Sequence, residues 1–290
     1  MKSTLYYLHA LSALHVGTGQ GAGVIDLPIA REKATHLPYV PGSGLKGVLR
    51  EELRPNNCAD KPRWDALFGP ERIQDDNGYA GALTVNDAHL LCFPVRSLAG
   101  TFAWATCPFI LARYGREAQW LSLDIPQIPD LPNDETASIT TDSVLTHQDI
   151  LVLEDLDLAI AKTADEWAKH IADAVFASDT YWQTLFKQRL AILPDGVFDF
   201  LAETATEVRA RIRIDQERRT VAKGALWYEE NLPAESILYG MVGAERARHK
   251  DINATAEEML KDIPQGPLRL QLGGKASVGR GQILWIKREA

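Results

Sequence analysis

The most regular pattern in the chain is an alternation of apolar and mostly arginine residues from 207 to 214. The apolar positions are Val208, Ala210, Ile212 and Ile214, and the polar positions are Glu207, Arg209, Arg211 and Arg213. Successive side chains of a strand point to opposite faces, so this pattern predicts a strand with one apolar and one cationic face. The turn region DQERRTVAKG and the run ALWYEE follow it. We expect a long hairpin over 207–232, with the apolar face on a core and the arginines outward.

Both ends of the chain predict strands that lead into glycine-rich loops. Residues 4–14 are apolar on both alternating sets, which is typical of a strand covered on both faces. They lead into a loop with glycine at 17, 19, 21 and 23, which closes at Asp26. The last segment, LRLQLGGKASVGRGQILWIKR, predicts a strand, a loop over 273–281 and another strand.

Helical spacing of apolar residues predicts several helices. The first begins at Ser43, which we expect to cap it, and it places Lys46 and Arg50 on one face. Pro108 suits the first turn of a second helix. Two further helical patterns cover 163–176 and 179–193, whereas 82–93 predicts a strand.

Two stretches read as insertions in a single domain over 1–290. Residues 54–80 predict an irregular surface insertion around a short WDALF turn. Four prolines between 124 and 135 exclude regular structure there, and 124–195 is expected to form an acidic loop and helical insertion.

Charge is distributed unevenly along the chain. There are 31 Lys+Arg and 39 Asp+Glu residues, a formal net charge of −8, which excludes a uniformly basic nucleic-acid binder. Eleven of the carboxylates lie between Asp124 and Glu166, against one base, Lys162. Binding of a polyanion depends on the local field, and residues 209–223 and 269–288 carry local excesses of positive charge. The total charge therefore does not exclude a polyanionic partner.

Composition places the chain among soluble proteins of a reducing compartment. Cys58, Cys92 and Cys107 form no CxxC pair, so neither a zinc knuckle nor a disulfide framework is indicated. No stretch reaches the roughly 18 apolar residues of a membrane span. We expect an unprocessed cytoplasmic protein with no membrane partner. Neither glycine loop fits a nucleotide-binding motif, and PGSGL lacks the spacing of a serine hydrolase.

Three separate cationic elements can contact phosphates: the hairpin, the start of the helix near residue 43, and the loop 273–281. Glycine loops and helix starts also offer backbone N–H groups to anions. Three sites suit an extended polyanion better than one small phosphate, although each can equally be a solvated face. The residues concerned are Ser43, Lys46, Arg50, Arg218, Arg219, Lys223, Gly273, Gly274, Lys275, Ser277, Gly279 and Arg280.

Five strings together carry a specific resemblance. They are LHVGTGQGAGVIDLPIARE, PGSGLKGVLRE, SLAGTFAWATCP, RIRIDQERRTVAKGALWYEENLP and LGGKASVGRG, and they run in order from His15 to Arg280. This set resembles the RAMP superfamily of CRISPR-associated proteins. More narrowly, it is similar to the backbone ribonuclease subunit of the type III-B (Cmr) effector complex.

The resemblance implies an α+β fold with a ferredoxin-like, RRM-derived core, an inserted helical region and a long β-hairpin thumb. It implies that several copies stack as a filament on one CRISPR RNA, together with other subunits of the effector complex. The thumb would reach over the neighbouring copy, so that nucleotides of guide and target flip out at regular intervals. Residues 43–50 and 273–281 correspond to contacts with the guide backbone.

The same comparison matches Asp26 with the aspartate required for metal-dependent cleavage of target RNA. RNA supplies its own 2′-OH nucleophile, so one carboxylate that holds Mg²⁺ or Mn²⁺ with waters is chemically sufficient. Asp26 can also simply accept backbone hydrogen bonds, as loop aspartates often do. His15 is a second acid–base candidate and Glu229 a weaker one.

The leading hypothesis is an RNA-guided endoribonuclease subunit of a type III-B complex that cuts complementary target RNA. One alternative is the equivalent backbone subunit of a type III-A complex. The other is a non-catalytic structural RNA-binding subunit. Trp227 and Tyr228 are candidates for base stacking, whereas Trp104 and Trp285 are expected in the core.

Overall fold

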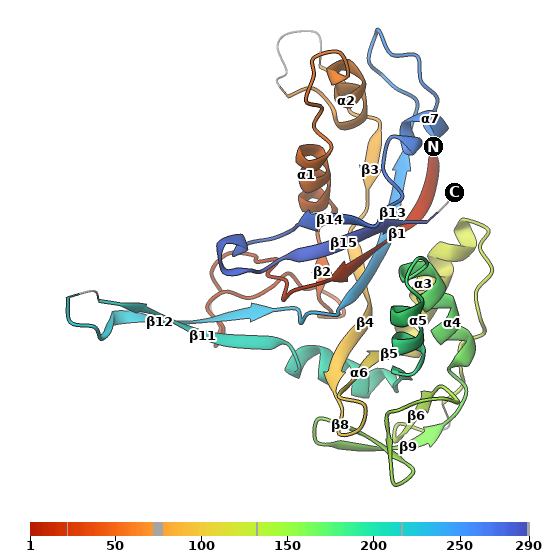
Figure 1. Cartoon of the computed structure of the whole chain (residues 1–290), viewed down its shortest axis with the longest axis vertical. Coiled ribbons are helices and arrows are strands. Elements are labelled where there is room, and N and C mark those ends of the chain that lie inside the picture. The colour runs from red at the N-terminus through yellow and green to blue at the C-terminus, as the bar shows by residue number, and fades with distance from the viewer. Residues whose placement is uncertain (22, 72–77, 132, 216, 289–290) are drawn as a thin grey trace.

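A computed structural model describes residues 1–21, 23–71, 78–131, 133–215 and 217–288 of the chain. The side chain of Lys223, one of the expected phosphate contacts, lies outside the described residues. Most of the described strands belong to one large mixed sheet, with helices packed beside it. A two-stranded hairpin projects from this body (Figure 1). The α+β class expected from the sequence is confirmed.

The N-terminal strand β1 (Lys2–Ala10) lies third from one edge of the sheet and pairs antiparallel with a strand on each side. These two neighbours are β13 (Ile237–Ala244) and β15 (Gln282–Lys287). Beyond β15 lies the edge strand β14 (Leu268–Gln271), and beyond β13 lies β4 (Ala88–Arg96). Tyr6, Tyr7 and Leu8 have no exposed surface. The prediction of a strand covered on both faces is confirmed, although it ends at Ala10.

Two short strands pair beside the main path, β2 (Tyr39–Val40) with β4 and β3 (Leu83–Val85) with β13. The strands that continue the sheet beyond β4 are β5 (Phe102–Thr106), β6 (Thr136–Ile139), β7 (Thr146–His147), β8 (Ile150–Leu153), β9 (Leu156–Ala161) and β10 (Leu190–Ile192). Strand β10 lies between β5 and β6 and is fully buried. The expected helix over 179–193 is therefore wrong in its last turn. A short buried apolar run fits a strand and a helix equally well, so periodicity did not separate them.

Seven helices are formed by the described residues. They are α1 (Gly42–Glu52), α2 (Lys61–Phe68), α3 (Pro108–Trp120), α4 (Asp165–Val175), α5 (Thr180–Lys187), α6 (Asp195–Thr204) and α7 (Ala256–Lys261). Helices α1 and α2 lie at one end of the molecule, and α3, α4 and α5 lie together at another (Figure 1). Within the described part of the chain, no helix has the length and apolar character needed to cross a bilayer.

Two expectations about the first helices are wrong. The residue that precedes α1 is Pro41, and Ser43 lies inside the first turn, where its side chain makes no capping hydrogen bond. The WDALF string belongs to the eight-residue helix α2, which buries Trp64, Leu67 and Phe68. The prediction of a helix that begins at Pro108 is confirmed. Trp104 and Trp285 are completely buried, as expected.

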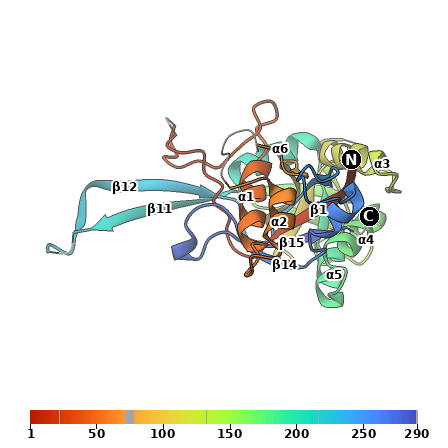
Figure 2. The same cartoon turned by 90° about the horizontal axis from the view of Figure 1, so that it is seen from above.

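The hairpin consists of β11 (Glu207–Ile214) and β12 (Val221–Asn231), and it extends away from the sheet (Figure 2). Its location is confirmed, but its apolar face does not lie on the core. Val208 is 47%, Ile212 49% and Leu226 54% exposed. Alternation shows only that one face is apolar, and it does not show what covers that face. A row of exposed apolar side chains on one face is typical of a binding surface.

Candidate functional site

The segment after the N-terminal glycine loop pairs with the base of the hairpin. Leu27 forms a parallel bridge with Glu229 of β12. The Leu27 N–H donates to the Tyr228 carbonyl at 3.0 Å, and the Glu230 N–H donates to the Leu27 carbonyl at 3.0 Å. Strand β12 is thus flanked by β11 on one side and by the Asp26 segment on the other. This pairing fixes the loop to the hairpin.

Asp26 lies at a cleft beside this pairing. Its Oδ2 accepts a hydrogen bond from the Tyr228 N–H at 2.8 Å. Among the described residues, Oδ1 has no hydrogen-bond partner. The side chain is exposed, and the cleft has a volume of about 470 Å³. The cleft is lined by Gln20, Gly21, Asp26, Leu27, Gly224, Leu226, Trp227 and Lys275. The backbone contact therefore orients the carboxylate and leaves one oxygen for a ligand.

Glu229 is buried and fully engaged in charged contacts. Its carboxylate lies 2.8 Å from Lys275 Nζ, 2.8 Å from Trp227 Nε1 and 3.2 Å from Arg211 Nε. Burial alone would raise the pKa of this carboxyl, but the hydrogen bonds from Lys275, Trp227 and Arg211 lower the pKa to about 2. A carboxylate this acidic and this well paired is a poor proton acceptor. These contacts link the hairpin base to the C-terminal glycine loop, and a catalytic role for Glu229 stays a prediction.

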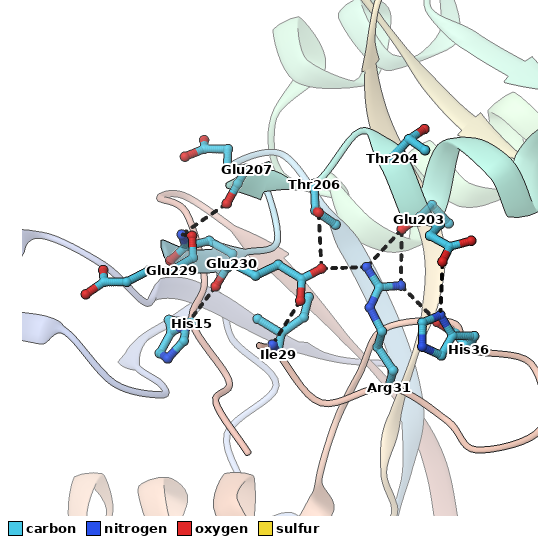
Figure 3. Close-up of polar contacts among 12 residues, drawn as sticks. His15, Ile29, Arg31, His36, Glu203, Thr204, Thr206, Glu207, Glu229 and Glu230 are labelled. Atoms are coloured by element: carbon cyan, nitrogen blue, oxygen red, sulfur yellow. Dashed lines mark hydrogen bonds and ion pairs between the residues drawn. The ribbon is translucent and has the colours of Figure 1, made fainter. Parts of the chain in front are cut away.

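Glu230 is a buried acid beside Glu229 that is absent from the candidate residues predicted from the sequence. It is 3% exposed, and its carboxylate accepts hydrogen bonds from three partners (Figure 3). These are the Ile29 N–H at 3.1 Å, Arg31 Nη2 at 2.6 Å and Thr206 Oγ1 at 3.1 Å. Two adjacent acids at the end of a strand signal buried charges that require partners. The partner Arg31 lies 199 residues away, beyond the reach of local patterns.

His15 is buried between the loops and does not belong to the residues that line the cleft. Its Nδ1 lies 2.7 Å from the Glu230 carbonyl (Figure 3). A Cβ on Gly17 would lie 2.7 Å from His15 Nε2, so the ring occupies the space beside that glycine. The histidine therefore packs against the start of the loop that leads to Asp26. A catalytic role for His15 stays a prediction.

The C-terminal glycine loop docks on the same region. The Gly274 N–H donates to the His15 carbonyl at 2.9 Å, and Lys275 forms the ion pair with Glu229. Arg280 is 5% exposed, with Nη1 3.3 Å from Glu207 Oε2. Ser277 and Gly279 are exposed. Of the two cations expected to contact phosphate here, Arg280 is therefore buried and Lys275 is partly neutralised.

The phosphate contacts expected on α1 do not line the cleft. Lys46 Nζ donates to the Leu83 carbonyl at 2.7 Å, and burial lowers the pKa of this ammonium. Arg50 Nη2 donates to the Gly69 carbonyl at 3.1 Å, and its guanidinium lies 4.6 Å from the centre of the Trp64 ring. Both side chains are half-buried. Each donates to a backbone carbonyl within the fold, and of the three expected contacts on α1 only Ser43 is exposed.

The hairpin turn presents the most accessible cations of the expected set. Arg218 and Arg219 are both exposed, and the Arg218 N–H donates to Asp215 Oδ1 at 3.0 Å. Both residues lie in the turn of a hairpin that projects from the body (Figure 2). The structure thus separates exposed cations at the tip from paired cations at the base.

No group of three or more His, Cys, Asp or Glu side chains in the described ranges is arranged to hold a metal ion. Asp26 offers one carboxylate oxygen on an exposed loop. Mg²⁺ commonly binds one or two carboxylates together with waters and substrate phosphate oxygens. Asp26 can therefore supply one ligand to an ion, and the described residues do not form a metal site built from protein alone.

Comparisons with known proteins match the whole chain. A family model described as the RAMP superfamily matches residues 7–283. The CRISPR system Cmr endoribonuclease Cmr4 of Pyrococcus furiosus is 36% identical over 287 residues, which cover 98% of this chain and 95% of that protein. The crystal structure of oligomeric Cmr4 from Pyrococcus furiosus has a TM-score of 0.75 at 27% identity, covering 100% of this chain and 99% of that chain.

A chain of the type III-B Cmr-beta complex bound to cognate target RNA is also similar. Its TM-score is 0.75 at 17% identity, and the match covers 99% of this chain and 97% of that chain. At this identity the likeness concerns the fold alone.

Proposed function

The chain belongs to the RAMP superfamily, and we propose that it is an RNA-guided endoribonuclease backbone subunit of a type III-B CRISPR effector complex. The observation that carries this proposal is Asp26, held by the Tyr228 N–H at a cleft beside the projecting hairpin. The nearly full-length similarity to a Cmr endoribonuclease favours this complex over the type III-A alternative.

We propose that four strands from the two ends of the chain and its middle form a ferredoxin-like core. The strands β15, β1, β13 and β4 are neighbours in that order. Helix α1 lies between β1 and β4 in the sequence, and α7 lies between β13 and β15. A β-α-β-β-α-β unit with this order of strands is the split βαβ arrangement. The helical region and the hairpin are then additions to it.

The hairpin is the thumb in this proposal. Copies of the chain stack along one CRISPR RNA, and each thumb reaches over the next copy. The exposed apolar residues of β11 and β12 support this role, because an isolated two-stranded ribbon is marginally stable in water and gains from a partner. Arg218 and Arg219 at the tip supply charge for RNA phosphates.

Cleavage requires a 2′-OH in line with the scissile phosphate, a proton acceptor and relief of negative charge. Asp26 is the residue that would hold Mg²⁺ or Mn²⁺ at the cleft, through its free oxygen. When bound, such an ion supplies charge neutralisation at the phosphate. The chain itself orients the carboxylate through the Tyr228 N–H and places Lys275 at the cleft wall.

An Asp26→Asn variant assembled with CRISPR RNA tests the catalytic assignment. We expect target affinity to be retained and the single-turnover cleavage rate to fall by at least about 100-fold, comparable to losing one major catalytic group. Asp155→Asn is the matched control, since Asp155 is exposed in the turn between β8 and β9. Normal cleavage by Asp26→Asn with target binding retained would show that the catalytic assignment of Asp26 is wrong.

Removal of divalent ions tests the metal separately. Excess chelator is expected to stop cleavage of bound target, and added Mg²⁺ or Mn²⁺ is expected to restore it. Target binding, measured in the same buffers, is the control. Continued cutting in excess chelator would remove the ion from the reaction while leaving Asp26 in it.

A further inference from the structure

We propose that the buried pair of Arg31 and Glu230 positions Asp26 for cleavage and couples it to the thumb hairpin. This inference rests on the proposed function, because it concerns the same carboxylate. Neither residue lines the cleft, so both act through the segment that carries Asp26. They are positioning residues and do not touch the substrate.

Glu230 contacts both flanks of the N-terminal glycine loop. Downstream of Asp26, its backbone N–H donates to the Leu27 carbonyl, and its Oε2 accepts from the Ile29 N–H. Upstream, its carbonyl lies 2.7 Å from His15 Nδ1. One residue of β12 therefore fixes the loop at three points, of which two lie within three residues of Asp26. The contacts to Ile29 and His15 are drawn in Figure 3.

Arg31 holds the carboxylate of Glu230 in this orientation. Its Nη2 lies 2.6 Å from Glu230 Oε1, and the two side chains are only 11% and 4% exposed. The guanidinium also donates to the Ala202 carbonyl near the end of α6 and to the His36 carbonyl. Five rigid N–H donors allow one arginine to join these three elements. The hairpin base, the Asp26 segment and α6 are thereby linked through one buried group.

Loss of Arg31 would leave a buried carboxylate without a countercharge, which is strongly unfavourable unless the group moves or takes up a proton. Either change alters the acceptor for the Ile29 N–H and loosens the pairing of Leu27 with β12. A displacement of about 1 Å at a reacting group is enough to slow a reaction by roughly 100-fold. The expected defect is therefore in the cleavage step and not in RNA binding.

The test is Arg31→Met in the complex assembled with CRISPR RNA. We expect single-turnover cleavage of bound target to slow by about 10- to 100-fold with target affinity unchanged. Amide hydrogen exchange is expected to quicken at Leu27 and Ile29 and to stay unchanged in β1. Arg31→Lys keeps the charge with fewer donors and should recover part of the rate.

Arg63→Met is the control, because Arg63 also pairs with a carboxylate, Asp262, and neither residue lines the cleft. It should cleave at the wild-type rate. Glu230→Gln provides a second, milder variant that keeps an acceptor for the Ile29 N–H. If Arg31→Met does not fold, the cleavage rate of Glu230→Gln tests whether the Arg31–Glu230 pair positions Asp26.

Wild-type cleavage by a folded Arg31→Met or Glu230→Gln would overturn the inference, as would a rate loss matched by an equal loss of target affinity. Unchanged exchange at Leu27 and Ile29 would do the same. If Asp26→Asn is inactive while Arg31→Met is fully active, only this inference fails. If Asp26→Asn cleaves normally, the proposed function itself fails.

Discussion

The two glycine-rich loops of the chain meet the base of the hairpin in the same manner but offer opposite charges. Glu230 links the N-terminal loop to β12 through Ile29, and Glu229 links the C-terminal loop through Lys275. Adjacent residues of a strand point to opposite faces. Each loop is therefore fixed from its own side of one short stretch of strand.

His15 connects the two loops. Its ring packs against Gly17, and its carbonyl accepts the Gly274 N–H. The N-terminal loop ends in an exposed carboxylate, one oxygen of which has no hydrogen-bond partner among the residues the structure describes. The C-terminal loop carries a lysine whose charge is balanced by Glu229. Glycine content is similar in the two loops and does not explain why one presents an exposed carboxylate and the other a paired lysine. The residues that anchor each loop to the hairpin explain this difference.

Gly273→Ala should give the largest loss of stability among changes to this region. Gly273 has a φ of +78°, and a Cβ there would overlap the carbonyl oxygen of His15. Strain and overlap together are expected to lower the free energy of unfolding by about 3 kcal/mol. Urea unfolding of the isolated chain measures this loss in the free energy of unfolding.

Gly279→Ala is the matched control. Gly279 has the same φ of +78°, but a Cβ would meet no atom within 4 Å. Only the backbone strain remains, which costs about 1 kcal/mol. Equal losses for the two variants would contradict the packing of the C-terminal loop against His15.

Glu229→Gln should destabilise the chain by about 2 kcal/mol near neutral pH, because it leaves Lys275 and Arg211 without their shared buried charge. The pKa of Glu229 is lowered from 4.5 in its unpaired state to about 2 in the fold by these partners, against the effect of burial. A depressed pKa contributes stability above the unfolded value and loses it as pH falls. The difference between wild type and variant should therefore shrink between about pH 4.5 and pH 2.

Glu257→Gln controls for the general effect of removing a carboxylate, since the Glu257–Lys261 pair is on the surface. It should change the unfolding curve little at any pH. A pH-independent difference between Glu229→Gln and wild type would show that the ion pairs of Glu229 do not hold the loop.

Local patterns located much of this architecture. Strand β1, helix α3 and the hairpin were predicted because each carries its own period or capping signal within a few residues. The last turn of the predicted helix over 179–193 was wrong, because three buried apolar residues fit the centre of a sheet as well as a helix. The strands β6 to β9 were missed within a region read as an acidic insertion.

The candidate site was only partly predictable for a different reason. Asp26 was found through the family resemblance, and its backbone contact to Tyr228 spans 202 residues. Pairings such as Arg31 with Glu230 depend on the folded arrangement and leave no local signal. The cationic residues were predicted from sequence as equal phosphate contacts, but a charge count does not reveal which of them a buried acid neutralises.

The smallest expected effect concerns those cations. Arg218→Met removes an exposed charge at the hairpin tip and should reduce the slope of log affinity for CRISPR RNA against log salt by about 1. Lys275→Met removes a charge that Glu229 already balances, so its slope should change by less. Both variants are compared in filter-binding titrations across salt concentrations. A larger slope change for Lys275→Met would show that RNA displaces Glu229 from Lys275, and the two loops would then differ less than their contacts indicate.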